Sequence, residues 1–373
     1  MSTIVSIQPS DVSLEVTWSD GMVTRYPWIW LRDHAHDEAS LHPVTQQRMV
    51  FTARLPRTLR ALDSTFDGDE LVITWDVLEP ESRLPVSFLE KYRHPRVARA
   101  SLDIPVTLWS GAAVESPTVA YADVMRTDAA VAQWLGKTVQ YGFCIVKDTP
   151  PTAGATEELL RRVAYVRHTI FGGFWEYSGD MAMADTGYST TELRNHTDGT
   201  YSHDAPGFQM LHCLAGAVSG GESTLVDGFA IARRLESESP DAFEVLSSVA
   251  VPGQYIGDGS HLMAARPVFR HDHTGRLVQV SFNNYDRAPF LLDESDMVAF
   301  YDAIRLFDEI ANEPSMQWRH TLQPGEALLF DNWRVLHGRA AYTGDRRICG
   351  GYLNREDVES RLRQMLAPAP RRS

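Results

Sequence analysis

Two short stretches, Asn195-His196-Thr197-Asp198 and Val335-Leu336-His337-Gly338-Arg339, contain two histidines and one aspartate that suit a single metal ion. Residues two apart on an extended strand point to the same face, so His196 and Asp198 would leave the chain on one side. His337 would complete the two imidazoles and one carboxylate that are typical of non-haem iron(II) oxygenases. Such a set leaves positions open for a co-substrate and dioxygen, whereas a closed four-ligand zinc site does not.

The His-x-Asp triplet also has a trivial explanation, because a chain with 13 histidines in 373 residues contains about one by chance. The pattern around His337 favours the metal site, since the apolar run from Gly325 to Phe330, a turn and Val335-Leu336-His337 predict strand, turn and strand. Arg346 follows shortly afterwards, where a guanidinium could hold the far carboxylate of a dicarboxylate bound to the metal. A surface ion pair is the alternative for Arg346.

The second half of the chain predicts many short strands interrupted by helices. The strands are expected at Gly207 to Leu214, Ser223 to Val226, Leu277 to Phe282, Gly325 to Phe330 and Arg347 to Tyr352, and the helices at Ala155 to Phe171, Gly228 to Leu235, Pro240 to Val249, Asp293 to Ala311 and Arg355 to Leu366. Short strands around a buried metal predict a mostly β fold with helical inserts, namely a double-stranded β-helix, or jelly roll.

The amino-terminal part has a strand pattern of its own, with Ser13 to Trp18 and Leu71 to Trp75 bounded by turn residues. We expect a small β-rich N-terminal domain over residues 1–95, a linker over 96–120 and the oxygenase domain over 121–373. A loop in the first domain contains His34, His36 and His42. The pattern leaves open whether this loop binds a metal or is an ordinary polar loop.

Composition limits the class of partner. The formal net charge of -14 argues against nucleic acid, because no basic stripe is present to neutralise phosphates. No apolar run is long enough to cross a bilayer and the amino terminus has no signal pattern, so we expect a cytoplasmic protein without membrane contact. Cys144, Cys213 and Cys349 are far apart, which favours reduced, buried thiols.

From one end to the other, the chain resembles the γ-butyrobetaine hydroxylase family of Fe(II)- and 2-oxoglutarate-dependent oxygenases. The matching segments are Trp30-Leu31-Arg32-Asp33, His42-Pro43, Gln46-Gln47-Arg48, His196-Thr197-Asp198, Ala205-Pro206-Gly207, Leu211-His212-Cys213, residues 220–229, Phe282-Asn283-Asn284 and residues 335–339. The resemblance implies that His196, Asp198 and His337 bind Fe(II), with 2-oxoglutarate and O2 as co-substrates. It also implies that Arg346, or failing that Arg347, and Thr224 bind the far carboxylate of 2-oxoglutarate, and it makes a homodimer plausible.

The same resemblance implies a substrate with a trimethylammonium group held in an aromatic cage. Ring faces suit this cation, which has no hydrogen-bond donor, and the cage positions are Phe171, Trp175, Tyr188 and Tyr352. Asp185 stands where γ-butyrobetaine hydroxylases have an asparagine, and an acid there would repel a carboxylate substrate. Candidate donors to a phosphonate are Asn195, Tyr201, Asn284 and Arg287.

We therefore expect hydroxylation of 2-trimethylaminoethylphosphonate at the carbon next to the phosphonate, with γ-butyrobetaine as the alternative and trimethyllysine less favoured. Two alternatives belong to other functional classes, namely a non-catalytic betaine-binding protein and a zinc hydrolase. The chain departs from the family pattern at a structural zinc site, because Ala35, Asp37 and Ser40 occupy positions where the family usually has cysteines. That zinc site is expected to be absent in its usual form.

Overall fold

The computed structural model describes residues 2–67, 69–76, 78, 81–94, 102, 104–111, 113–177, 189–216, 219–257 and 259–366. The chain divides into two compact units, residues 1–100 and 101–370. Within the described ranges, no helix combines the length and the apolar character that a bilayer crossing requires.

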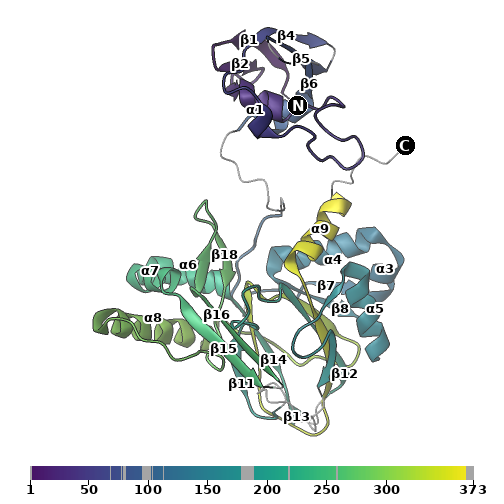
Figure 1. Ribbon diagram of the computed structural model, residues 1–373. Coiled ribbons are helices and arrows are strands. Elements are labelled where there is room, and N and C mark those ends of the chain that lie inside the picture. The colour runs from purple at the N-terminus through teal and green to yellow at the C-terminus, as the bar shows by residue number, and fades with distance from the viewer. Residues whose placement is uncertain are drawn as a thin grey trace. The chain divides into compact units, whose positions relative to one another are not determined.

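The amino-terminal unit is a small β structure, as the strand pattern predicted (Figure 1, purple). It contains the antiparallel strands β1 (Ile4–Pro9), β2 (Ser13–Trp18) and β3 (Val23–Pro27), the helices α1 (Trp28–Asp33), η1 (Thr52–Arg54) and α2 (Val86–Lys91), and a second antiparallel sheet of β4 (Ala61–Asp67), β5 (Glu70–Trp75) and β6 (Ser82–Pro85). Alternate residues of β2 and β5, among them Trp18 and Trp75, are buried in one core. This alternation is the period of a sheet with one buried face.

The second unit contains the predicted jelly roll, built from two facing sheets. The larger sheet has the order β10 (Phe174–Tyr177), β23 (Arg347–Leu353), β12 (Phe208–Ala215), β20 (Ala327–Asp331), β8 (Phe143–Lys147) and β7 (Thr118–Ala120), with β9 (Val166–Arg167) beside β23. The smaller sheet has the order β11 (Leu193–His196), β21 (Val335–Arg339), β14 (Ser223–Asp227) and β19 (Trp318–His320). Phe330 and Ile348 of the larger sheet share a buried core with Leu225 and Val335 of the smaller one. The two sheets therefore pack face to face.

Three two-stranded antiparallel sheets complete the strands of this unit. They are β13 (Ser219–Gly220) with β22 (Tyr342–Thr343), β15 (Val251–Gly257) with β16 (Ser260–Arg266), and β17 (Phe269–His271) with β18 (Leu277–Val280).

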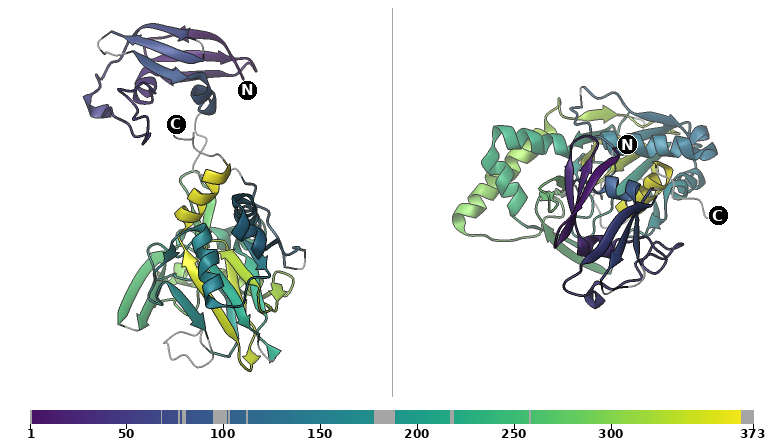
Figure 2. Two further views of the ribbon diagram at one scale, coloured as in Figure 1. Left: turned by 90° about the vertical axis from the view of Figure 1, so that its right-hand side faces the viewer. Right: turned by 90° about the horizontal axis from the view of Figure 1, so that it is seen from above.

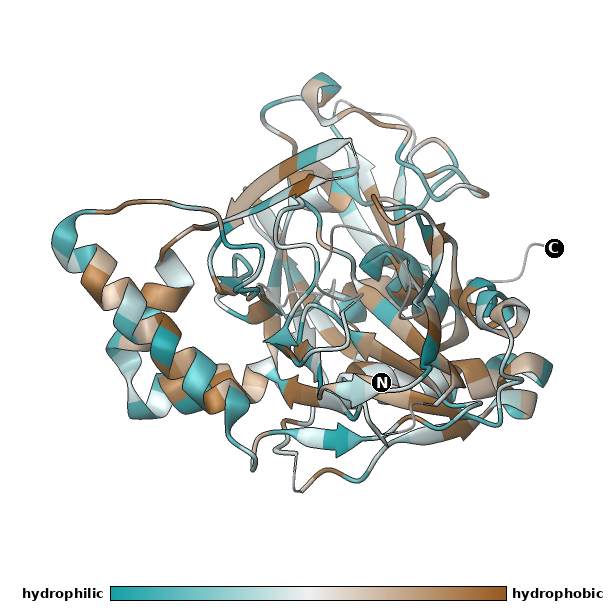
Figure 3. Cartoon of the chain, turned by 90° about the horizontal axis from the view of Figure 1, so that it is seen from below, coloured by the Kyte–Doolittle hydropathy of each residue, from teal (hydrophilic) through white to brown (hydrophobic). Residues whose placement is uncertain are grey.

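Helices cover the outer faces of both sheets (Figures 1 and 2). The larger sheet is covered by α4 (Asp128–Tyr141), α5 (Ala153–Val163) and α9 (Arg355–Leu366), with α3 (Tyr121–Arg126) beside α4, and the smaller sheet by α6 (Gly228–Glu238), α7 (Pro240–Ser248) and α8 (Glu294–Asn312). Hydrophobic and hydrophilic residues alternate along these helices in Figure 3, which is the pattern of a helix with one buried face. The central strands of the smaller sheet, β14 and β21, are consequently buried on both sides.

The boundary between the units differs from the expected linker of residues 96–120. Trp109 is buried between the sheets, and its backbone N–H donates to Oδ2 of Asp227 at 3.2 Å. Residues 118–120 form β7, which pairs in parallel with β8. The described residues from 104 onward thus belong to the second unit. The linker prediction was wrong here because an irregular segment with prolines can still pack against a sheet.

Candidate metal centre and active-site pocket

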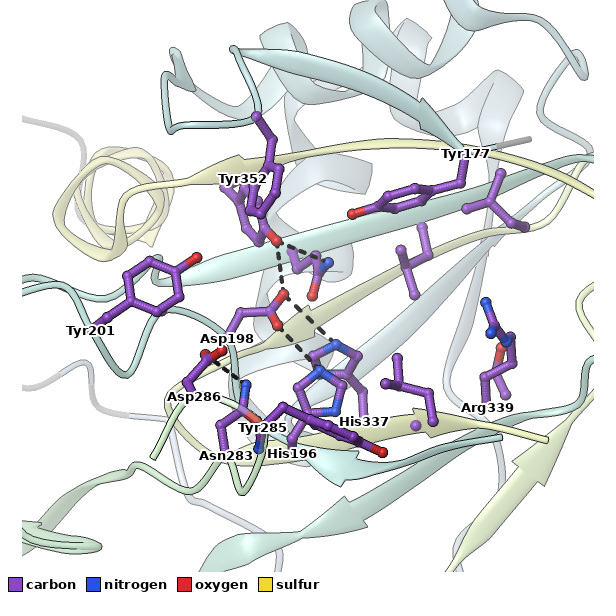
Figure 4. Close-up of a pocket in the computed structure, with 18 of the residues that line it drawn as sticks. Tyr177, His196, Asp198, Tyr201, Asn283, Tyr285, Asp286, His337, Arg339 and Tyr352 are labelled. Atoms are coloured by element: carbon purple, nitrogen blue, oxygen red, sulfur yellow. Dashed lines mark hydrogen bonds and ion pairs between the residues drawn. The ribbon is translucent and has the colours of Figure 1, made fainter. Parts of the chain in front are cut away.

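Three side chains from two distant stretches meet between the sheets. His196 is the register partner of His337 on neighbouring strands, and their ring centroids lie 4.3 Å apart. Asp198 follows β11, and its Oδ1 and Oδ2 atoms lie 3.3 Å from Nε2 of His196 and 3.7 Å from Nε2 of His337. Figure 4 shows the three groups pointing toward one another. Within the described part of the chain, they are the one cluster of metal-binding side chains, with ligand atoms within 4.8 Å of one another.

Burial and charge set the protonation states of this cluster. Burial, and then the neighbouring His196, lower the pKa of His337 to about 3. Burial tends to raise the pKa of Asp198, but the charges of both histidines hold it well below its usual range. For His196, burial lowers the pKa and contact with Asp198 more than offsets this, so its pKa is raised. Metals bind an ionised carboxylate and neutral imidazoles. Asp198 and His337 therefore already have the binding form, whereas His196 would give up its proton when a metal binds.

The surrounding contacts fit a metal as well. Nδ1 of His196 lies 2.8 Å from the carbonyl oxygen of Arg194, which suits an Nδ1–H donor and leaves Nε2 as the ligand atom. The hydroxyl of Tyr352 donates to Oδ2 of Asp198 at 2.7 Å. Two imidazole nitrogens and one carboxylate oxygen, oriented in this way, form the donor set of non-haem iron(II).

The metal cluster opens into a cavity of about 100 Å³ between the sheets. Its walls are formed by Phe171, Tyr177, Leu193, Gly199, Tyr201, Gln209, Leu211, Ser223, Asn283, Tyr285, Asp286, Gly338, Arg339, Arg346, Ile348 and Tyr352, besides the three metal-binding side chains. Figure 4 places Arg339 on one side of the cluster and Tyr201 with Asp286 on the other. The cavity is thus cationic at one end and acidic and aromatic at the other.

The cationic end contains Arg346, one of the two arginines considered for 2-oxoglutarate. Side chains alternate along a strand, and Arg346, Ile348 and Tyr352 all line the cavity. Burial lowers the pKa of Arg346 to about 10, assisted by the charge of nearby Arg339, and no carboxylate of a described residue pairs with Arg346. Arg347 is half exposed, and its guanidinium binds Glu176 at 2.6 and 2.8 Å.

Thr224 and Asn195 lie on the other face of the smaller sheet, away from the cavity. The Thr224 hydroxyl donates to Oδ1 of Asn195 at 2.7 Å, and Nδ2 of Asn195 donates to the carbonyl oxygen of Ala311 in α8 at 3.2 Å. Their sequence neighbours Ser223 and His196 line the cavity instead. The structure therefore does not bring Thr224 to a 2-oxoglutarate site or Asn195 to a substrate site.

The other substrate candidates are only partly brought together. Tyr201 lines the cavity, whereas Asn195, Asn284 and Arg287 line a neighbouring hollow that also borders His196. The Arg287 guanidinium there lies 5.7 Å from the centroid of the Tyr301 ring. Asp185 and Tyr188 lie outside the described residues.

Of the cage candidates, Phe171 and Tyr352 line the cavity. Trp175 packs behind them, with its ring centroid 5.9 Å from that of Tyr352 and 4.4 Å from that of Tyr177. Tyr177 also lines the cavity and was missed, although it lies two residues beyond Trp175 on the same face of β10. Asp286 was missed too, since it stands in a loop without a periodic pattern.

The histidines of the amino-terminal loop make contacts within their own unit. Nε2 of His34 lies 2.6 Å from the Arg48 guanidinium, which also binds Asp33. His36 packs on the Phe88 ring at 4.5 Å, and Nδ1 of His42 accepts from two backbone N–H groups. These contacts fit the polar-loop interpretation.

Comparison with known proteins agrees with this geometry. Residues 103–352 match the taurine catabolism dioxygenase TauD, TfdA family, and residues 5–84 match the gamma-butyrobetaine hydroxylase-like N-terminal family. With the jelly roll and the His-Asp-His cluster, these matches define an Fe(II)- and 2-oxoglutarate-dependent dioxygenase.

Curated relatives match across nearly the whole chain. A trimethyllysine dioxygenase of Meyerozyma guilliermondii is 32% identical over 94% of this chain and 92% of that protein, and one of Neurospora crassa is 35% identical over 93% and 82%. A gamma-butyrobetaine dioxygenase of Pongo abelii is 30% identical over 94% and 93%. The chain belongs to the γ-butyrobetaine hydroxylase family.

Proposed function

We propose that this protein hydroxylates a small substrate bearing a trimethylammonium group. The observation that carries the proposal is the polarity of the cavity, which has two arginines at one end and a carboxylate with aromatic rings at the other. Ring faces and a carboxylate attract a quaternary ammonium by about 0.5 to 2 kcal/mol per ring contact. Arginines instead suit the carboxylate of a co-substrate.

Each end of the cavity has its own task in this proposal. His196, Asp198 and His337 would hold Fe(II), which with 2-oxoglutarate and O2 supplies the oxidising chemistry that converts a C–H bond into an alcohol and releases succinate and carbon dioxide. Arg346 would fix the far carboxylate of 2-oxoglutarate. The aromatic rings at the other end would fix the trimethylammonium group, so that one carbon of the substrate lies at the metal. Such placement accelerates the reaction and selects the position of attack.

We also propose which trimethylammonium compound is the substrate. The phosphonate expectation depended on Asp185, which is outside the described residues, and on four donors, of which Tyr201 alone lines the cavity. Asp286 favours a substrate with a primary ammonium group in addition to the trimethylammonium group, because an ammonium can donate to a carboxylate. Trimethyllysine has this group, and two relatives are named for it. We therefore place trimethyllysine first, ahead of 2-trimethylaminoethylphosphonate and γ-butyrobetaine.

Succinate release with the three compounds at equal concentration tests this order. We expect the fastest turnover with trimethyllysine, and Asp286→Asn should raise its KM about tenfold through loss of a charged contact. The KM for γ-butyrobetaine should change less. Faster wild-type turnover of the phosphonate would restore the first expectation, and no succinate above the substrate-free rate with any compound would refute the proposed class.

A binding protein without catalysis is separated from an oxygenase by a second measurement. Anaerobic addition of Fe(II) and 2-oxoglutarate should give a weak visible charge-transfer band in an oxygenase and none in a simple binder. The cytoplasmic location and the homodimer stay predictions.

A further inference from the structure

Asn332 lies in the turn between β20 and β21, and its side chain binds the backbone of the segment that carries a metal ligand. Oδ1 accepts the N–H of Asp198 at 2.8 Å, and Nδ2 donates to the carbonyl oxygens of Asp198 at 3.0 Å and Pro206 at 2.9 Å. The side chain is buried, with 1% of its surface exposed. Its amide is thus engaged with one loop through three hydrogen bonds.

These bonds replace strand pairing that Asp198 lacks. Strand β11 ends at His196, so the backbone of Asp198 lies beyond the ladder that joins β11 to β21. Buried N–H and C=O groups must find partners, and an unpaired one costs about 1 to 3 kcal/mol. Asn332 supplies both partners, while the intervening Thr197 N–H donates to the carbonyl oxygen of Phe282 at 2.7 Å. The loop is therefore held from two sides.

The turn with Asn332 leads directly into the strand that presents His337. One short segment consequently carries the distal histidine and grips the backbone of the aspartate. We propose that Asn332 is a positioning residue of the iron site, which sets the spacing between the Asp198 carboxylate and the His337 imidazole. Groups that orient metal ligands typically contribute a factor of about 10 to 100 to metal affinity.

Metal titration of the purified full chain tests this role, with Mn(II) as a redox-stable probe. We expect Asn332→Ala and Asn332→Asp to weaken Mn(II) binding by about 10- to 100-fold and to diminish the anaerobic visible band formed with Fe(II) and 2-oxoglutarate. The aspartate variant keeps an acceptor for the Asp198 N–H but loses the donor to the two carbonyl oxygens. Asn332→Ser serves if the alanine variant does not fold.

Asn354→Ala is the matched control. Asn354 accepts from Arg167 and donates to Asp357, both at 3.1 Å, and it touches none of the three ligand residues. It should lower the melting temperature without changing Mn(II) affinity. Folded Asn332 variants that bind Mn(II) within twofold of the wild type would overturn the proposal, even if their melting temperature falls. Since no substrate is added, this outcome is independent of the proposed function.

Discussion

The hydroxyl of Tyr352 donates a 2.7 Å hydrogen bond to Oδ2 of Asp198. This bond joins the two sheets, because Tyr352 lies on β23 of the larger sheet and Asp198 follows β11 of the smaller one. Nε2 of Gln209 lies 3.4 Å from the same hydroxyl. The family resemblance assigns the Tyr352 ring to cation binding, and the ring's hydroxyl also orients a metal ligand. The two roles can be separated by experiment.

Tyr352→Phe removes the hydroxyl and keeps the ring. We expect Mn(II) affinity to fall about tenfold, because a hydrogen bond to a charged group contributes roughly 1.5 to 3 kcal/mol. The KM for a trimethylammonium substrate should change less, since the ring face remains. Titration calorimetry and steady-state kinetics measure the two effects. Tyr121→Phe, which removes an exposed hydroxyl bonded to Glu158 at 3.1 Å, should alter neither.

Removal of the metal should abolish turnover. We expect a chelator to stop succinate formation, added Fe(II) to restore it and Zn(II) to fail, because zinc has no redox chemistry. His337→Ala should have the same effect as the chelator, while His261→Ala, on a hairpin outside the cavity lining, should keep wild-type activity. Oxygen consumption that persists in the His337→Ala variant would contradict the metal site.

The metal cluster could be predicted from the sequence because its signal is local. The short spacing of His196 and Asp198 and the strand pattern before His337 are both visible in the chain. The expected strand through both residues is only partly correct, because β11 ends at His196 and Asp198 lies in the loop that follows. Arg346 shares this advantage, since it lies two residues before Ile348 on the alternation that leads to Tyr352.

The direction of Thr224 could not be predicted in the same way, whereas alternation along the strand already points Asn195 away from His196. All five residues of β14 are buried, because α6, α7 and α8 cover the outer face of the smaller sheet. A strand buried on both faces shows no alternation of apolar and polar residues, so its pattern does not distinguish inside from outside. Asp286 was missed for another reason, since a loop has no period that predicts which side chain enters a cavity.

Stability at low pH should depend on His212, which is fully buried and lies 2.7 Å from the Thr156 hydroxyl through Nδ1. Burial lowers its pKa from 6.5 to about 4. The unfolded chain therefore binds more protons between these values, so the stability present above pH 6.5 declines as the pH falls toward 4, by up to about 3 kcal/mol.

Denaturant unfolding at several pH values measures this dependence. His212→Leu should lose stability less steeply than the wild type between pH 6.5 and 4, and the difference between the two slopes isolates His212 from the other histidines. Parallel slopes would show that the burial of His212 does not oppose its protonation.

Arg346 and Arg347 provide a matched pair for locating the 2-oxoglutarate site. Arg346→Ala should raise the KM for 2-oxoglutarate by roughly 10- to 100-fold, because a guanidinium that binds a carboxylate in the cavity contributes charge-assisted hydrogen bonds. Arg347→Ala removes only the half-exposed ion pair with Glu176, which contributes about 0 to 1 kcal/mol, so the KM should stay within about twofold of the wild type. The KM values of both variants are obtained from the rate of succinate release at varied concentrations of 2-oxoglutarate. A larger rise in KM for Arg347→Ala than for Arg346→Ala would instead assign the co-substrate to Arg347. The strand β23 would then have to present its other face to the cavity, which conflicts with the positions of Ile348 and Tyr352.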